Sequence, residues 1–160
     1  MRSSLVLTVL LIVACDHNTK TDERPGSDTP IQQVAPAPTN GAKVYLATPT
    51  GEIAVDVEIV STEAKIERGL MYRQHMAPDA GMLFILPEDK NWTFWMRNTL
   101  IPLDMIFIRK DLTIAGIVEN AEPKTETLRQ VNETSSYVLE VNGGWTRAHG
   151  VVKDVKVRLP

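Results

Sequence analysis

The segment from Glu52 to Val60 constrains the fold more than any other part of the sequence, because apolar and polar residues alternate along it. Ile or Val occupies positions 53, 55, 57 and 59, and Glu, Ala or Asp occupies the positions between them. Successive side chains of a β-strand point to opposite faces, so this alternation predicts a half-buried strand with one face in water. Lys43–Ala47 precedes it across the turn-rich bridge Thr48–Gly51, and the two segments predict a hairpin.

Further short strands are predicted along the rest of the chain, with two short helices between them. Ser61 or Thr62 can cap a helix that ends near Met71, and a second short helix runs to His149 and stops at Gly150. We therefore expect a mainly β fold with one or two short helices, built as a jelly-roll-like sandwich or an incomplete barrel. The additional strands are Gly81–Leu86, Trp92–Asn98, Leu103–Arg109, Leu112–Glu119, Tyr137–Val141 and Lys153–Leu159.

The first residues predict a secretory signal peptide that ends at the single cysteine of the chain. Arg2 supplies positive charge and Leu5–Ala14 is apolar. Crossing a bilayer as a helix takes about 20 apolar residues, so this run is too short for a permanent anchor. The ending Ile12-Val13-Ala14-Cys15 resembles the bacterial lipobox, with Ile12 where Leu is commonest. The resemblance implies cleavage before Cys15, diacylglycerol on its thiol, and anchoring to the membrane through acyl chains.

The segment that follows Cys15 predicts a tether. Residues 16–40 contain four prolines among Asp, Thr, Ser, Gln and Ala, a composition that cannot bury enough apolar surface to offset the entropy of ordering. The expected division is a signal peptide over 1–14, a lipidated cysteine with a disordered tether over 15–40, and a β-rich domain over 41–160. Asp16 resembles an inner-membrane retention signal, so we expect an envelope protein facing the periplasm, or alternatively the cell surface.

Several ordered blocks of the folded region resemble an uncharacterised family, domain of unknown function 192. They include Phe94-Trp95-Met96-Arg97-Asn98-Thr99 and Val138-Leu139-Glu140-Val141-Asn142-Gly143-Gly144. The resemblance implies a compact, mostly β domain of jelly-roll-like type that is often exported, and it implies no activity. The family often has Gly-Asp before the last strand, where this chain has Lys153-Asp154. The other matching blocks are Glu67–Arg73, Gly81–Phe84 and Ile101–Phe107.

Five polar residues stand inside otherwise apolar blocks and form the candidate ligand pocket. They are Arg68, Arg73, Asn98, Asp104 and Glu140. If Asp104 and Glu140 point inward, each needs a partner such as Arg73, since an unpaired buried charge is costly. Arg and Asn side chains can bind an anion or a carbonyl, whereas two carboxylates can act as the acid and base of glycoside cleavage. Structural ion pairs and caps are the alternative to both.

A second group of residues combines thioethers, imidazole and indole. Thioethers suit Cu(I), and an indole face can lie against a cation, so a soft-metal site is a further hypothesis. Its residues are His75, Met76, Trp95 and Met96, with Met71, Met82 and Met105 nearby in sequence. The alternative is that the methionines fill the core beside aromatic rings. No motif for structural zinc, a phosphate loop or a catalytic serine occurs, and no cofactor is expected.

The sequence thus favours an envelope lipoprotein whose β domain binds a small ligand or a partner protein without catalysis. An enzyme acting on cell-wall glycan and a copper-binding protein are the alternatives. The formal net charge of -3 gives no electrostatic case for nucleic acid. A 43% hydrophobic and 23% charged composition is that of an ordinary folded domain.

Overall fold

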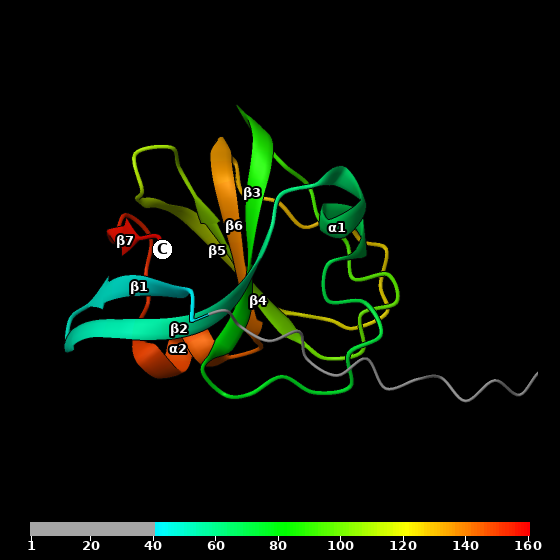
Figure 1. Cartoon of the computed structure of the whole chain (residues 1–160), viewed down its shortest axis with the longest axis horizontal. Helices are drawn as coiled ribbons and strands as arrows, with labels where there is room; N and C mark the ends of the chain where they lie inside the picture. The colour runs from blue at the N-terminus through cyan, green and yellow to red at the C-terminus, as the bar shows by residue number, and fades with distance from the viewer. Residues whose placement is uncertain (1–40) are drawn as a thin grey trace, which may run out of the picture. The chain divides into compact units, whose positions relative to one another are not determined.

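A computed structural model describes residues 41–160, and within them the chain forms one curled sheet of seven strands with two short helices (Figure 1). The sheet order is β5-β4-β6-β3-β2-β1-β7, and every neighbouring pair is antiparallel except β2 and β3. Of the two expected architectures the molecule has the incomplete barrel. The strands are β1 (Lys43–Thr48), β2 (Gly51–Val60), β3 (Ala80–Lys90), β4 (Leu103–Ile108), β5 (Ile114–Ala121), β6 (Ser135–Asn142) and β7 (Val157–Arg158). The predictions for Cys15, the signal peptide and the tether lie outside the described residues.

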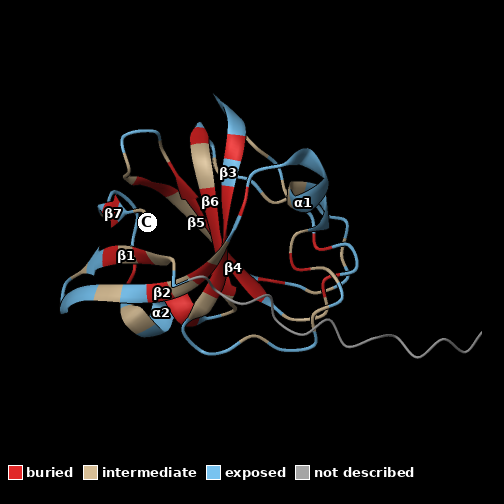
Figure 2. Ribbon diagram, viewed as in Figure 1, coloured by how far each residue is buried: buried red, intermediate tan, exposed pale blue. Residues whose placement is uncertain are grey.

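Apolar side chains pack on both faces of the sheet. The first cluster contains residues from all seven strands, together with Trp145 of α2 (Trp145–His149). The second cluster lies on the opposite face, under Leu70, which follows α1 (Glu63–Arg68), and under the segment that includes Met96. The two helices therefore cover opposite sides of the sheet (Figure 1). The strand β4, which lies between β5 and β6, is buried along its whole length, as expected for a strand covered on both faces (Figure 2).

The predicted hairpin is confirmed, and the strand β2 departs from strict alternation only at its end. Val55 and Val57 are buried in the first cluster, whereas Ile59 is 42% exposed and Val60 packs in the second cluster. Thr62 is the N-cap of α1 but makes no side-chain capping bond, and Gly69 ends the helix at a φ of 45°. The predicted strand over 92–98 is wrong: only Phe94 forms an isolated bridge, to Arg129, and the bulky residues of this segment pack as a loop against the second cluster.

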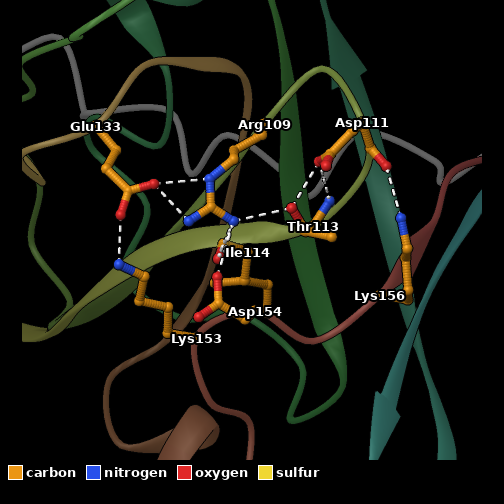
Figure 3. Close-up of polar contacts among 8 residues, drawn as sticks. All are labelled: Arg109, Asp111, Thr113, Ile114, Glu133, Lys153, Asp154 and Lys156. Carbon is orange, nitrogen blue, oxygen red and sulfur yellow. Dashed lines mark hydrogen bonds and ion pairs between the residues drawn. The ribbon is translucent and has the colours of Figure 1, made fainter.

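An ion-pair network joins the β4–β5 turn to the C-terminal segment (Figure 3). The Arg109 guanidinium donates to Glu133 at 2.7 Å and to the Thr113 hydroxyl at 2.9 Å, and it lies 3.0 Å from Asp154. Lys153 also donates to Glu133. Lys153 stands where the resembling family often has Gly, and the positive φ of this turn falls on Asp154, at 66°. The departure from the family pattern therefore adds an ion pair without straining the turn.

The described residues contain no helix that is long and apolar enough to cross a membrane.

Candidate functional site

A cavity of about 300 Å³ lies over the second apolar cluster, between the sheet, the end of α1 and the loop that contains Trp92 and Trp95. Phe84 and Glu140 contribute from the sheet and are buried, whereas Trp95 is 39% and Leu128 60% exposed. The sheet residues therefore form the floor of the cavity, and the loop residues form its rim. The volume lies at the lower end of the range of small-molecule sites.

Four aromatic rings make the lining of the cavity mainly apolar. They belong to Phe84, Trp92, Phe94 and Trp95. Phe84 and Phe94 meet edge to face at a centroid distance of 5.5 Å, which fixes the ring planes beside the floor. Gly69 closes one wall, where a Cβ would come within 3.3 Å of the Phe84 ring. The cavity is therefore framed by packed rings on one side and by the end of α1 on the other.

Glu140 is the one carboxylate at the floor, and it has no hydrogen-bond or ion-pair partner among the described residues. It lies on β6 and is 4% exposed. Its neighbours across the sheet are Met82 on β3 and Met105 on β4, which offer no hydrogen-bond donor. Burial without a compensating partner raises the pKa of the Glu140 carboxyl from 4.5 to about 8. At neutral pH this carboxyl is mostly protonated.

Asp104, by contrast, is a fully satisfied structural carboxylate on the other face of the sheet. Its Oδ1 accepts from the backbone amides of Asn120 (2.7 Å) and Gly144 (2.9 Å). Its Oδ2 accepts from the amide (2.8 Å) and the hydroxyl (2.5 Å) of Thr146. Three of these four donors belong to the start of α2, where a carboxylate satisfies amides that the helix itself leaves free, and the fourth is the Asn120 amide of β5. Asp104 therefore holds α2 against the sheet.

The predicted carboxylate pair does not form, because Asp104 and Glu140 alternate onto opposite faces. Asp104 lies opposite Val141 across the β4–β6 ladder, and Met105 lies opposite Glu140. Ile106 and Val141 belong to the first cluster, whereas Met105 and Val138 belong to the second. The two acids therefore have no shared cleft.

The expected partner of Asp104, Arg73, pairs with Glu58 instead. The guanidinium donates to both carboxylate oxygens, one bond being 2.6 Å long, and both side chains are nearly buried. The pair lines a second cavity of about 470 Å³, which also contains Lys65. Arg68 lines both cavities. Of the five predicted residues, the structure thus brings Arg68 and Glu140 to one cavity and places Arg73 in its neighbour.

Asn98 lies at an exposed turn beside the first cavity. Its backbone φ is 56°, its carbonyl accepts from the Tyr72 amide at 2.8 Å, and its side-chain amide lies 4.0 Å from the sulfur of Met71. The residue therefore holds the turn that carries Met71, which lines the cavity.

The predicted soft-metal residues are dispersed. Met96 is fully buried in the second cluster, Met76 packs against that cluster, and His75 is exposed. Trp95 lines the cavity. Within residues 41–160 no group of three or more His, Cys, Asp or Glu is placed to hold a metal ion.

Sequence reasoning missed several residues of the cavity. Trp92 and Phe94 were assigned to a strand, and Thr99 and Leu128 carried no signal of their own. Glu58 was assigned to the wet face of β2, which concealed its pairing with Arg73. Only the Phe94-Trp95 pair inside a block of the family pattern marked this loop.

This geometry defines the class of protein: a small curled β-sheet domain with a ligand-sized aromatic cavity. The chain belongs to the DUF192 family, described as an uncharacterized ACR, whose profile matches residues 45–159. A comparison with curated proteins finds no match.

Two solved structures are similar over most of the domain. One is a candidate transcription regulator from Sinorhizobium meliloti, with 41% identity, a TM-score of 0.71, and coverage of 74% of this chain and 92% of that chain. The other is a protein of unknown function from Novosphingobium aromaticivorans, with 33% identity, a TM-score of 0.72, and coverage of 79% and 94%. Both solved chains consist almost entirely of the part that matches.

Proposed function

We propose that this chain is a non-catalytic binding protein of the bacterial envelope, whose β domain holds a small organic ligand in the aromatic cavity above Glu140. The observation that carries the proposal is the carboxyl of Glu140, buried at the cavity floor without a partner among the described residues. A buried polar group that lacks hydrogen bonds costs stability, and an apolar residue of similar size would avoid this cost. A ligand that hydrogen-bonds to the carboxyl would offset this cost.

The arrangement supports binding better than glycan cleavage. General acid–base cleavage needs two carboxylates facing one bond at a separation of roughly 5–10 Å. Glu140 faces the cavity, whereas Asp104 accepts all four of its hydrogen bonds on the other face, three of them from the start of α2. Glu67, which also lines the cavity, is exposed at its wall. These positions give no matched acid and base.

The proposal also includes the localisation of the protein. A lipidated Cys15 would hold the domain at the membrane, and the segment 16–40 would separate it from the lipid surface. Asp16 favours the inner membrane, with the cell surface as the alternative. The role named for the Sinorhizobium relative is not part of the proposal, because the net charge of -3 offers no electrostatic support for DNA binding.

A thermal-shift screen of a small-molecule library, run on the wild type and on a cavity-filled variant, tests the proposal. Met71→Phe adds a ring at the cavity wall, and Glu122→Gln changes an exposed residue that does not line the cavity. A ligand at about 100 times its Kd adds roughly 2.7 kcal/mol of stability, which raises Tm by several degrees for a domain of this size. The proposal requires compounds that stabilise the wild type and Glu122→Gln but not Met71→Phe. A library without such a compound would contradict it.

A further inference from the structure

The charge and the aromatic lining of the cavity restrict the class of ligand. Besides Glu140, the charged residues that line the cavity are Glu67 and Arg68, adjacent residues of opposite charge at the end of α1. Their charges offset each other, which leaves Glu140 as the one charged lining residue without a counter-charge. On the flanking strands Glu140 faces Met82 and Met105, and no cation of the described residues pairs with it.

The two indoles of the loop already interact with positive charge. The Lys90 ammonium lies 4.1 Å from the centre of the Trp92 ring, and the Arg97 guanidinium lies 4.7 Å from that of Trp95. An aromatic face attracts cations through its quadrupole, and groups of such rings recognise alkylated ammonium ions. Both of these cations are themselves paired, Lys90 with Glu88 at 3.4 Å and Arg97 with Glu126 at 2.8 Å. The two indoles, with Phe84 and Phe94, line the same cavity as the unpaired carboxyl of Glu140.

From this lining we infer that the ligand is a small organic cation, an alkylammonium whose charged head contacts Glu140 and whose alkyl groups contact the aromatic walls. The inference rests on the proposed function and adds the ligand class to it. A neutral ligand that accepts a hydrogen bond from the protonated carboxyl is the competing occupant, and the experiment below separates the two.

Binding of a cation is coupled to ionisation of Glu140. The free protein holds this carboxyl mostly protonated at pH 7, since its pKa is about 8. An ammonium head favours the ionised form, so binding releases a proton, and the apparent affinity rises with pH until about pH 8. The expected gain is roughly 100-fold between pH 6 and pH 9, by the fraction of protein in the competent state. A neutral acceptor shows the opposite trend, because it needs the protonated form.

Choline and 3,3-dimethylbutan-1-ol are matched probes, because the alcohol has the same shape as choline without its charge. Both are titrated against the purified full chain from pH 6 to pH 9 by tryptophan fluorescence. Trp92 and Trp95 line the cavity, whereas Trp145 packs in the first cluster on the other face, so its signal does not depend on the ligand at any one pH. The variants are Glu140→Gln, which has nearly the same shape without an ionisable group, and Glu122→Gln as the matched exposed control.

The inference predicts that choline binds more tightly than the alcohol, that its affinity rises about 100-fold over this pH range, and that Glu140→Gln removes both effects while Glu122→Gln retains them. Binding of the alcohol with equal or greater affinity, or choline binding that is unchanged in Glu140→Gln, would overturn the cation and leave a neutral-ligand cavity in place. Absence of binding by both probes would also overturn the cation. The library screen on Met71→Phe would then decide the proposed function by itself.

Discussion

Replacement of Glu140 by Gln is expected to stabilise the domain, by an amount that depends on pH. In the unfolded chain this carboxyl ionises with a pKa of 4.5, whereas burial raises it to about 8 in the folded domain. Between these values the unfolded state has lost a proton that the folded state retains, so stability falls as pH rises. The slope is about 1.4 kcal/mol per pH unit. Glutamine has nearly the same shape and does not titrate, so the variant lacks this loss.

The expected difference is close to zero near pH 4, about 3 kcal/mol in favour of Glu140→Gln at pH 7, and close to 5 kcal/mol at pH 9. Urea unfolding of the wild type and the variant at each pH, followed by tryptophan fluorescence, measures it. Other titrating groups are common to both proteins and cancel in the difference. Glu122→Gln, at an exposed position, should follow the wild type. If the curves for Glu140→Gln and the wild type run parallel from pH 4 to pH 9, Glu140 is not an uncompensated buried acid, and the reasoning fails.

Three further changes probe the rest of the molecule. Asp104→Asn should lower the free energy of unfolding in urea by about 2–4 kcal/mol, because the amide replaces one acceptor oxygen with a donor that faces backbone N–H groups. Unchanged stability would show that α2 does not depend on this carboxylate. The ion pairs with Lys153 and Arg109 lower the pKa of Glu133, so the stability that they add is present above pH 4.5 and is lost as pH falls. In Glu133→Gln the free energy of unfolding should therefore fall less steeply on acidification than in the wild type. An unaltered slope would contradict a stabilising role for these pairs. Cys15→Ser should abolish incorporation of labelled palmitate and move the protein to the soluble fraction of a bacterial lysate, whereas labelling that persists would exclude Cys15 as the anchor.

The strands were predictable where one face is wet and the other buried. In β2 the alternation of Val55 and Val57 with polar neighbours predicted both the strand and its buried face, and the structure confirms both. Around Trp92 and Phe94 the same kind of composition led to a wrong strand prediction. These rings pack onto the second cluster from a loop, and only Phe94 forms a bridge to another segment. Aromatic residues favour strands because a strand lets them pack on a half-buried surface. In this segment the loop places them on such a surface, so no strand is needed.

The candidate site was predictable in its residue types but not in its grouping. β4 is buried on both faces, so periodicity cannot say which face carries Asp104. The answer depends on the β4–β6 register, which places Met105 rather than Asp104 beside Glu140. Arg73 finds its partner in Glu58, and that pairing depends on how α1 returns the chain to the β2 strand. Glu140 was identified from its apolar setting alone, which is the property that makes it unusual in the fold.

The central claim is that Glu140 is kept as an uncompensated acid for a ligand. The direct measurement is a pH titration of its side-chain carboxyl by carbon-13 NMR, with and without saturating choline. The account predicts a pKa of about 8 in the free protein and a clearly lower pKa when choline is bound. A pKa near 4.5 in the free protein would show that the carboxyl is already solvated or paired, and the case for this cavity as a binding site would fail.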